Sequence, residues 1–320
     1  NLDLGWEISR TINAGLDFGF LNNKLNGYIE FYNTKTSDLL MKRAIPTFTG
    51  FNEIWQNIGK TQNKGFEFNL NYAPVRTKDL NIDFTFNASR NWEKILELIS
   101  GEDLPNNKWF IGEPLSVLYN YEKLGVWQYG EEEDAAKYNA SVGDLKIKDQ
   151  DGDGTISAVK DRVILGQERP KWIASLGANI QYKNFDFSFN INSRWGYSFN
   201  LAPFNDVVLD GQRWLPAVDY WTPDNPTNNY PKADQSNGWD TYRSANGYQK
   251  GDHIKLQDVT VGYSFDKLLS KTFIKKARFY VQLRNVAYLY KATDFGIMPE
   301  APDMNYTIPS SYNFGVNVTF

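Results

Sequence analysis

The chain has no cysteine and only one histidine, His253, among its 320 residues. Without thiols, neither a disulfide framework nor a thiolate metal site can form. A single imidazole rules out most zinc sites and most Ser-His-Asp arrangements within the chain. No apolar run approaches the ~18 residues of a transmembrane helix, which excludes a helical membrane protein. A β-barrel is not excluded, because its alternating strands average out in any hydropathy window.

Excess charge of either sign is also lacking. The chain carries 34 Lys and Arg residues against 38 Asp and Glu residues, a net charge of −4. We therefore expect no nucleic-acid partner, and with no catalytic constellation in view we expect no enzyme. An initiator methionine and a signal peptide are missing as well, so the chain is expected to be a fragment or a processed piece.

The last eight residues show what the chain does contain, which is strict alternation of apolar and polar side chains. One face carries Phe314, Val316, Val318 and Phe320, and the other carries Asn313, Gly315, Asn317 and Thr319. A period of two indicates a β-strand with one apolar and one polar face. The order of residues, ending on an aromatic, resembles the insertion signal of outer-membrane barrels. A soluble sandwich strand can show the same alternation.

Similar alternation recurs along the chain, at residues 16–20, 25–31, 66–72, 80–88, 172–182, 185–191, 254–265 and 279–284. Its phase changes near Gln257 and Asp258, which predicts a β-bulge. Aromatic residues make up 16% of the chain, enough to supply girdles at two membrane interfaces. The pattern predicts an all-β fold.

The connections between these segments alternate in length. Short turns are expected at residues 22–24, 74–79, 113–114 and 183–184 and a longer one at 266–276, with long polar segments at 42–62, 99–108, 129–170, 200–252 and 292–309. A sandwich has no reason to place every long loop at one end, whereas outer-membrane barrels do so. Neighbouring strands of such a barrel run in opposite directions, and the last strand must end at the side of the short turns. The directions are consistent only if residues 109–112 form a short strand running toward that side. The number of strands is then about eleven, half of a 22-stranded barrel. We therefore predict a transmembrane antiparallel β-barrel, with residues 1–320 as its carboxy-terminal half and 129–170 as an extracellular loop.

An acidic motif within that loop predicts a calcium site. Residues 149–157 match the first nine positions of an EF-hand-type loop, with Gly154 at the sixth position for the sharp turn. The twelfth position is Lys160 instead of glutamate, so the next residue is expected to close the site. The predicted ligands of a structural Ca²⁺ are the side chains of Asp149, Asp151, Asp153 and Asp161 and the carbonyl of Thr155. The alternative is an acidic, turn-rich surface loop without stoichiometric metal.

Four tryptophans lie in or beside the long segment rich in Asn, Asp and Pro. They are Trp195, Trp214, Trp221 and Trp239. Aromatic faces can stack on sugar rings while neighbouring polar side chains bond to hydroxyls, so these residues are candidates for substrate binding. The alternative is that they pack the loop onto itself or onto a partner.

Several motifs then occur in a recognisable order: WE at residues 6–7 and GLDF at 15–18, NIG at 57–59 and NKGFE at 63–67, GDLK at 143–146, DQDGDG at 149–154, WTPDNP at 221–226 and PE at 299–300. In this order the chain resembles the carboxy-terminal barrel portion of SusC/RagA-type TonB-dependent outer-membrane transporters. The spacing from Asp149 to Asp161 is one residue longer than the usual pattern of that family.

The resemblance implies a place in the outer membrane of a Gram-negative bacterium, in contact with lipid. It also implies an amino-terminal plug and TonB box outside this sequence, through which TonB supplies energy, and a SusD-like surface lipoprotein that caps the barrel. The implied function is import of oligosaccharides or, in some members, peptides. A soluble Ca²⁺-stabilised glycan-binding β-protein and an outer-membrane barrel enzyme are the competing hypotheses.

Overall fold

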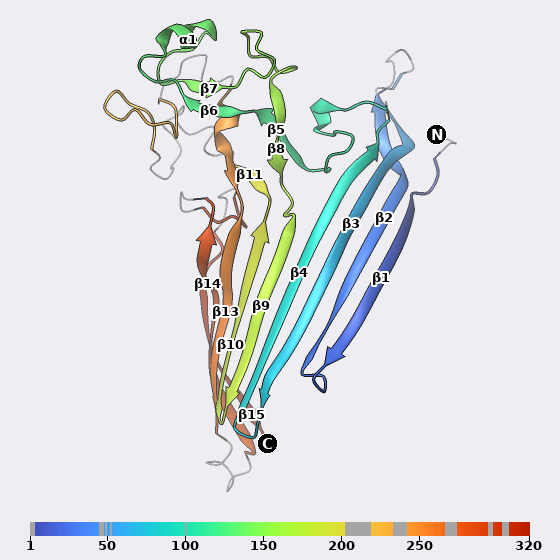
Figure 1. The fold of residues 1–320 in the computed structure, drawn as a ribbon, viewed down its shortest axis with the longest axis vertical. Coiled ribbons are helices and arrows are strands. Elements are labelled where there is room, and N and C mark those ends of the chain that lie inside the picture. The colour runs from blue at the N-terminus through green and yellow to red at the C-terminus, as the bar shows by residue number, and fades with distance from the viewer. Residues whose placement is uncertain are drawn as a thin grey trace.

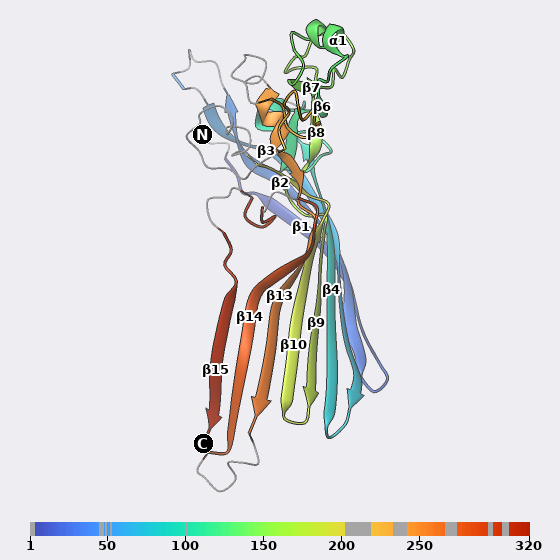
Figure 2. The same cartoon turned by 90° about the vertical axis from the view of Figure 1, so that its left-hand side faces the viewer.

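The computed structural model describes residues 4–44, 48, 50–51, 53–99, 101–201, 219–232, 242–265, 274–293, 297–302 and 307–320. Its largest element is one nine-stranded antiparallel sheet, in which the strands follow one another in chain order (Figure 1). The strands are β1 (Ile8–Phe20), β2 (Leu25–Ala44), β3 (Glu53–Arg76), β4 (Leu80–Glu97), β9 (Trp172–Tyr182), β10 (Phe185–Trp195), β13 (His253–Ser264), β14 (Lys276–Lys291) and β15 (Ser311–Thr319). The sheet is curved and open, with β1 and β15 at its two edges (Figure 2).

The two ends of the sheet differ. At one end, called the turn end, the connections 21–24, 77–79 and 183–184 are short, and the carboxy terminus lies there (Figure 1). At the other, called the loop end, β4 connects to β9 and β10 to β13 through long excursions that carry small elements of their own. These elements are η2 (Pro105–Asn107), β5 (Val117–Tyr121), β6 (Lys123–Val126), α1 (Glu132–Lys137), β7 (Leu145–Ile147), β8 (Arg162–Gln167), β11 (Ser198–Asn200), η3 (Arg243–Gly247) and β12 (Tyr248–Lys250). We call them together the loop layer.

One face of the sheet is apolar from edge to edge. Because directly paired residues share a face, the register sets the side chains of successive strands in rows. One row runs Leu16–Ile29–Phe68–Ala88–Ala174, and another contains Phe187, Val261, Val281 and Phe314. The side chains at the edges of this face are the most exposed, Leu16 by 63% and Phe314 by 78%, and those between them are exposed or half-buried. A soluble protein rarely presents an apolar patch of this extent.

The opposite face is polar and internally hydrogen-bonded. Asn69 Nδ2 donates to Asn87 Oδ1 at 2.7 Å, and Asn87 Nδ2 donates to Ser175 Oγ at 3.2 Å. Farther along the sheet, the Arg278 guanidinium donates to both carboxylate oxygens of Asp186, at 2.8 and 2.5 Å. The alternation seen in the sequence therefore separates an apolar from a polar surface across all nine strands.

A glycine in the terminal strand has a steric reason. Gly315 lies opposite Tyr280 of β14, and a Cβ at this glycine would come within 2.2 Å of the tyrosine ring. The phenol ring therefore covers the glycine backbone on the polar face. The expected bulge in β13 is confirmed, because Asp258 pairs with Asn190 and Leu256 pairs with Ile191, which leaves Gln257 as the extra residue.

Four sequence-based expectations on the strands are wrong. The sheet has nine strands and not eleven among the described residues. Residues 109–112, expected to form a descending strand, make only isolated bridges to Leu104 and Ile95, because four residues are far fewer than the ~9–11 that a membrane strand needs. The turn expected at 113–114 lies at the loop end, so the connection from β4 to β9 is one excursion. The directions of the nine strands then alternate correctly without an extra strand.

The fourth correction concerns residues 42–62, expected to be a long polar loop. Most of it is strand, because β2 and β3 continue as an antiparallel ribbon in which Lys42 pairs with Trp55. Among the described residues, no helix is both long and apolar enough to cross a membrane.

The conventional hydrophobic core lies in the loop layer and not in the sheet. One cluster joins Tyr197, Phe199, Leu201, Tyr230 and Ile297, and a second joins Tyr121, Leu145, Ile147 and Ala245. The first cluster packs the β10–β13 excursion against Ile297, which follows β14. The second packs the β4–β9 excursion against η3 of the β10–β13 excursion, so segments far apart in the sequence form one small folded unit.

Candidate functional site

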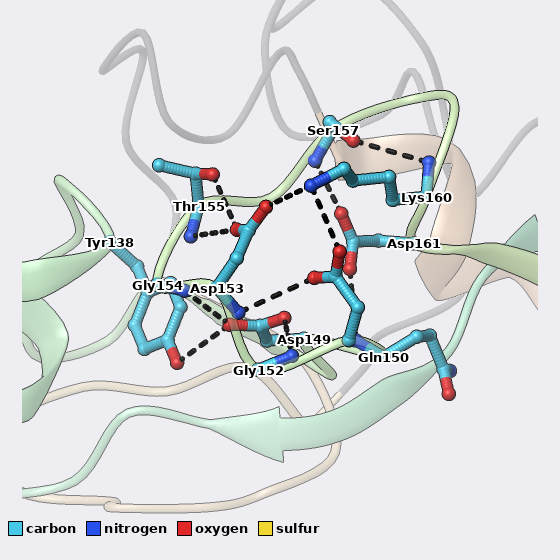
Figure 3. Close-up of polar contacts among 11 residues, drawn as sticks. Tyr138, Asp149, Gln150, Gly152, Asp153, Gly154, Thr155, Ser157, Lys160 and Asp161 are labelled. Atoms are coloured by element: carbon cyan, nitrogen blue, oxygen red, sulfur yellow. Dashed lines mark hydrogen bonds and ion pairs between the residues drawn. The ribbon is translucent and has the colours of Figure 1, made fainter.

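The acidic turn between β7 and β8 is built by its own side chains (Figure 3). Asp149 accepts hydrogen bonds from the backbone N–H of Gly152 at 2.7 Å and of Gly154 at 2.8 Å. Asp153 Oδ1 accepts from the Thr155 backbone N–H at 2.9 Å. Both glycines have positive φ, +73° and +85°, a conformation that favours glycine. The motif thus folds locally into the tight turn that its sequence predicts.

Three carboxylates converge at this turn. Oxygens of Asp149, Asp151 and Asp153 lie within 4.8 Å of one another. The Lys160 ammonium, at the twelfth position of the motif, lies 3.0 Å from Asp151 Oδ2 and is hydrogen-bonded to Asp153. The hydrogen bond from Lys160, followed by those from Thr155, lowers the pKa of Asp153 to about 2. The same carboxylate raises the pKa of Lys160. The lysine therefore supplies a cation where the sequence motif predicts a metal.

Asp161 has a different environment from the other acids. It is fully buried, and its two oxygens accept from the backbone N–H groups of Gln150 at 2.9 Å and Ser157 at 2.6 Å. The carboxylate thereby fastens the beginning of the turn to its end. The three clustered carboxylates have the ligand chemistry of a hard-cation site. Asp161 stabilises the loop behind them through its two backbone hydrogen bonds.

The candidate tryptophans divide into two groups. Trp214 and Trp239 lie outside the described residues. Trp195 ends β10, where its ring stacks on Tyr290 at 5.4 Å and 12°, and it pairs with Trp172 of β9. Trp221 is only 6% exposed. Its indole N–H donates to Gln128 Oε1 at 3.1 Å, and its ring packs against Tyr129. This packing leaves Trp221 little surface for a sugar.

A polar cavity that the sequence did not indicate lies in the loop layer. It has a volume of about 470 Å³ and is bordered by the start of β6, β8, residues 228–230, η3 and β12. The Lys123 ammonium beside it donates to the Asn229 carbonyl and to Asn246 Oδ1. Burial lowers the pKa of Lys123 to about 8. Asn246 Nδ2 has no hydrogen-bond partner among the described residues. Because the burial of Lys123 depends on segments distant in sequence, local patterns could not reveal it.

The protein family follows from a match to a known sequence family. The sequence model of the TonB dependent receptor-like, β-barrel family matches residues 1–286. The chain belongs to this family. The sequence-based resemblance to SusC/RagA-type TonB-dependent transporters is confirmed, as is the antiparallel β-barrel fold class, although the sheet of this chain is not closed.

Relatives of this TonB-dependent receptor barrel are similar over nearly the whole chain. A TonB-dependent receptor of Formosa agariphila is 32% identical over 354 residues, covering 100% of this chain and 35% of the relative. The TonB-dependent receptor SusC of Bacteroides thetaiotaomicron is 29% identical over 340 residues, covering 100% of this chain and 32% of the relative. The chain therefore spans about a third of the length of these receptors.

A solved structure supports the fold independently. The structure of the RagAB peptide transporter superposes with a TM-score of 0.77 at 24% identity, over 100% of this chain and 36% of that chain. At this identity the likeness shows the fold alone. It places the open nine-stranded sheet as one part of a larger barrel.

Proposed function

We propose that this chain is the carboxy-terminal part of a TonB-dependent importer that carries oligosaccharides or peptides across the outer membrane of a Gram-negative bacterium. Segments outside this chain supply the plug and the contact with TonB, and a SusD-like lipoprotein covers the loop end. The proposal is supported by family membership and by the names of the relatives, SusC and the RagAB peptide transporter.

The observation that carries the proposal is the division of the sheet into two faces. An apolar face that runs from β1 to β15 without protein cover suits lipid, and a polar face of hydrogen-bonded amides suits an aqueous lumen. The long connections gather at one end, as extracellular loops do in such barrels. A soluble glycan-binding protein would have to bury the apolar face, so the geometry disfavours that alternative.

An uptake assay tests this function. Cells carrying the complete gene and cells lacking it would be given fluorescent oligosaccharides and, in parallel, fluorescent short peptides. We expect uptake of one class to depend on the gene, on the proton gradient that powers TonB and on the partner lipoprotein. Uptake that persists without the gradient, or a complete protein found in a soluble fraction, would contradict the proposal.

We also propose that the acidic turn binds one Ca²⁺ through Asp149, Asp151 and Asp153, with the Thr155 carbonyl as a further ligand. Asp161, which we expected from the sequence to be a ligand, instead holds the two ends of the turn together behind the ion. Oxygen ligands at alternate positions suit Ca²⁺, and a cation relieves the mutual repulsion of three carboxylates. Bound calcium would take over the charge-neutralising role of Lys160 and hold the loop between β7 and β8.

Calorimetric titration of the complete protein with Ca²⁺ tests this site. We expect stoichiometric uptake by the native protein and its loss in Asp151→Asn combined with Asp153→Asn. Asp134→Asn is the matched control, because this exposed carboxylate of α1 pairs with Lys137 away from the cluster. If the native protein takes up no calcium, the turn is an acidic surface loop neutralised by Lys160.

A further inference from the structure

A row of three basic side chains and one glutamine crosses β1 to β4 on the apolar face, just beyond its apolar part. Arg10 is directly opposite Lys35, Lys35 is opposite Gln62, and Gln62 is opposite Lys94. These four positions therefore form one continuous cross-strand row. The register is unbroken from here toward the turn end until Tyr72 of β3, so the row shares its face with the apolar residues.

The next rows toward the turn end mix cations with aromatic rings. Lys64 lies opposite Trp92, and Arg90 lies opposite both Phe66 and Trp172. The Arg90 guanidinium carbon is 4.4 Å from the Trp92 ring centroid and 4.8 Å from that of Trp172. This is the geometry of a cation held between two indole faces. Beyond these residues the face is apolar.

The described acidic residues leave these charges without an ion pair. Arg10, Lys35, Lys64, Arg90 and Lys94 make no ion pair with any described carboxylate. Arg10, Lys35, Lys64 and Lys94 are exposed. Like charges directly opposite on neighbouring strands, such as Arg10 and Lys35, destabilise a sheet. The ion pairs Lys42–Glu53 and Lys60–Glu97 lie farther toward the loop end, where the same ribbon does match its charges.

A hollow accompanies the row. A cavity of about 610 Å³ is bordered by the aromatic rings of Phe31, Phe66 and Trp92 and by the cations Lys64 and Lys94. The one acid in its lining, Glu93, is ion-paired with Arg169. Such a boundary fits an amphiphile whose chains lie on the apolar face and whose anionic group meets the cations. Long basic side chains reach from an apolar surface to a polar headgroup in this way.

We propose that this surface, which we call the cationic row (Arg10, Lys35, Lys64, Arg90 and Lys94), binds the phosphate groups of a membrane lipid in the leaflet at the loop end. Lysine and arginine are the usual partners of phosphate. Binding supplies the anions that the row lacks and anchors the β1–β4 side of the barrel at a fixed depth. The inference rests on the proposed membrane location but not on transport.

Lipid binding by the complete, delipidated protein in detergent tests this, with native mass spectrometry as the readout. The probes are bis-phosphorylated lipid A, phosphatidylglycerol and phosphatidylcholine, the last being zwitterionic. We expect lipid A to be retained over phosphatidylcholine, and Lys35→Gln with Lys94→Gln to weaken that retention roughly tenfold or more. If phosphatidylglycerol is retained as well as lipid A, a phosphate group alone is sufficient for binding to the cationic row. If it is retained less well, the row recognises the headgroup of the glycolipid.

The control variant has the same change of charge at the other end of the sheet. Lys183→Gln with Lys276→Gln alters two lysines at the turn end and should leave lipid A retention unchanged. All four substituted side chains are exposed, so both variants should fold, which resistance to unfolding on gels would verify. Equal retention of lipid A by the native protein and the Lys35, Lys94 variant would overturn the proposal. So would equal retention of phosphatidylcholine. Since binding is measured without uptake, a failure here is distinct from a failure of the transport function.

Discussion

The sheet and the loop layer of this chain are stabilised in opposite ways. In the sheet, large apolar side chains such as Leu16 and Phe314 point outward without protein cover, and the sheet's other face is polar. In the loop layer, Trp127, Leu145 and Leu201 are buried as in a soluble domain. Apolar burial drives both. The apolar face of the sheet needs a cover that the described residues do not supply, which our proposal assigns to lipid, whereas the loop layer buries its own core.

The two regions also differ in how their polar groups are arranged. Along the sheet, the hydrogen-bond ladders and the two-residue periodicity repeat with little variation, as a structural scaffold requires. In the loop layer, charged and polar groups are placed singly, as with Lys123 beside its cavity or Asp161 within the acidic turn. Regions built in these two ways should respond differently to substitution.

The largest effect should come from a cavity in the loop layer. Leu145→Ala removes a side chain that is 4% exposed and packs with Tyr121 and Ala245, and such truncations cost about 2–5 kcal/mol. Because the layer has its own core, we expect faster protease cleavage within 117–167 while the sheet stays intact. Leu124→Ala, at a 55% exposed position in the same layer, is the control. If the strands of the sheet are cleaved equally fast, the two regions unfold as one.

A charge on the apolar face should cost nearly as much, but only in a membrane. Phe187→Arg places a cation on that face, where arginine costs about 2–4 kcal/mol at the bilayer midplane and less toward the turn end. Ser188→Arg, one residue away on the polar face, should cost far less. Urea unfolding in lipid vesicles would measure both. Equal costs for the two variants would mean that the faces are not lipid and lumen.

Filling the space over a sheet glycine should have a smaller effect. Gly315→Val would force the Tyr280 ring away from the position 2.2 Å from the new Cβ, and such overpacking typically costs about 1–3 kcal/mol. We expect slower assembly into membranes, measured by the gel shift of the folded barrel. Combining Gly315→Val with Tyr280→Ala should restore assembly. No recovery in the double variant would show that the glycine serves another purpose.

The smallest effect concerns the acidic turn. Lys160→Met removes the ammonium that pairs with Asp151 and Asp153 and competes with a bound cation. Exposed ion pairs are weak, so calcium affinity should rise only several-fold in calorimetric titration. Lys137→Met, which pairs with Asp134 on α1, should leave the affinity unchanged. A fall in affinity on removing Lys160 would show that the lysine supports the site.

The two regions also differed in how far the sequence could predict them. Alternation predicted the sheet because neighbouring residues, such as Phe187 and Ser188, determine the two faces of a strand. A change in the phase of the alternation predicted the bulge at Gln257. The acidic turn could also be predicted from the sequence, because Asp149 and Gly154 contact each other within one short segment. The metal itself and the substrate role of the tryptophans stay predictions.

Local patterns failed where distant segments decide. Residues 109–112 were expected to form a strand only because the strand directions seemed to require one, but bridges to Leu104 and Ile95 hold them at the loop end. The length of β2 and β3 was hidden because their polar outer parts pair with each other beyond the apolar face. The cationic row was invisible for the same reason, since only the register shows that Lys35 and Lys94 lie on one line with Arg10.

The most direct test of the account is the environment of alternate residues along β10. The 320 residues contain no cysteine, so single cysteines can be introduced at Phe187, Ser188, Phe189 and Asn190 in a complete protein kept free of other thiols. Spin labels at these sites in lipid vesicles would report collisions with oxygen, which concentrates in lipid, and with a water-soluble nickel complex. We predict oxygen-accessible labels at Phe187 and Phe189 and nickel-accessible labels at Ser188 and Asn190. Labels that show the same accessibility at all four sites would contradict a sheet with one lipid face and one lumen face.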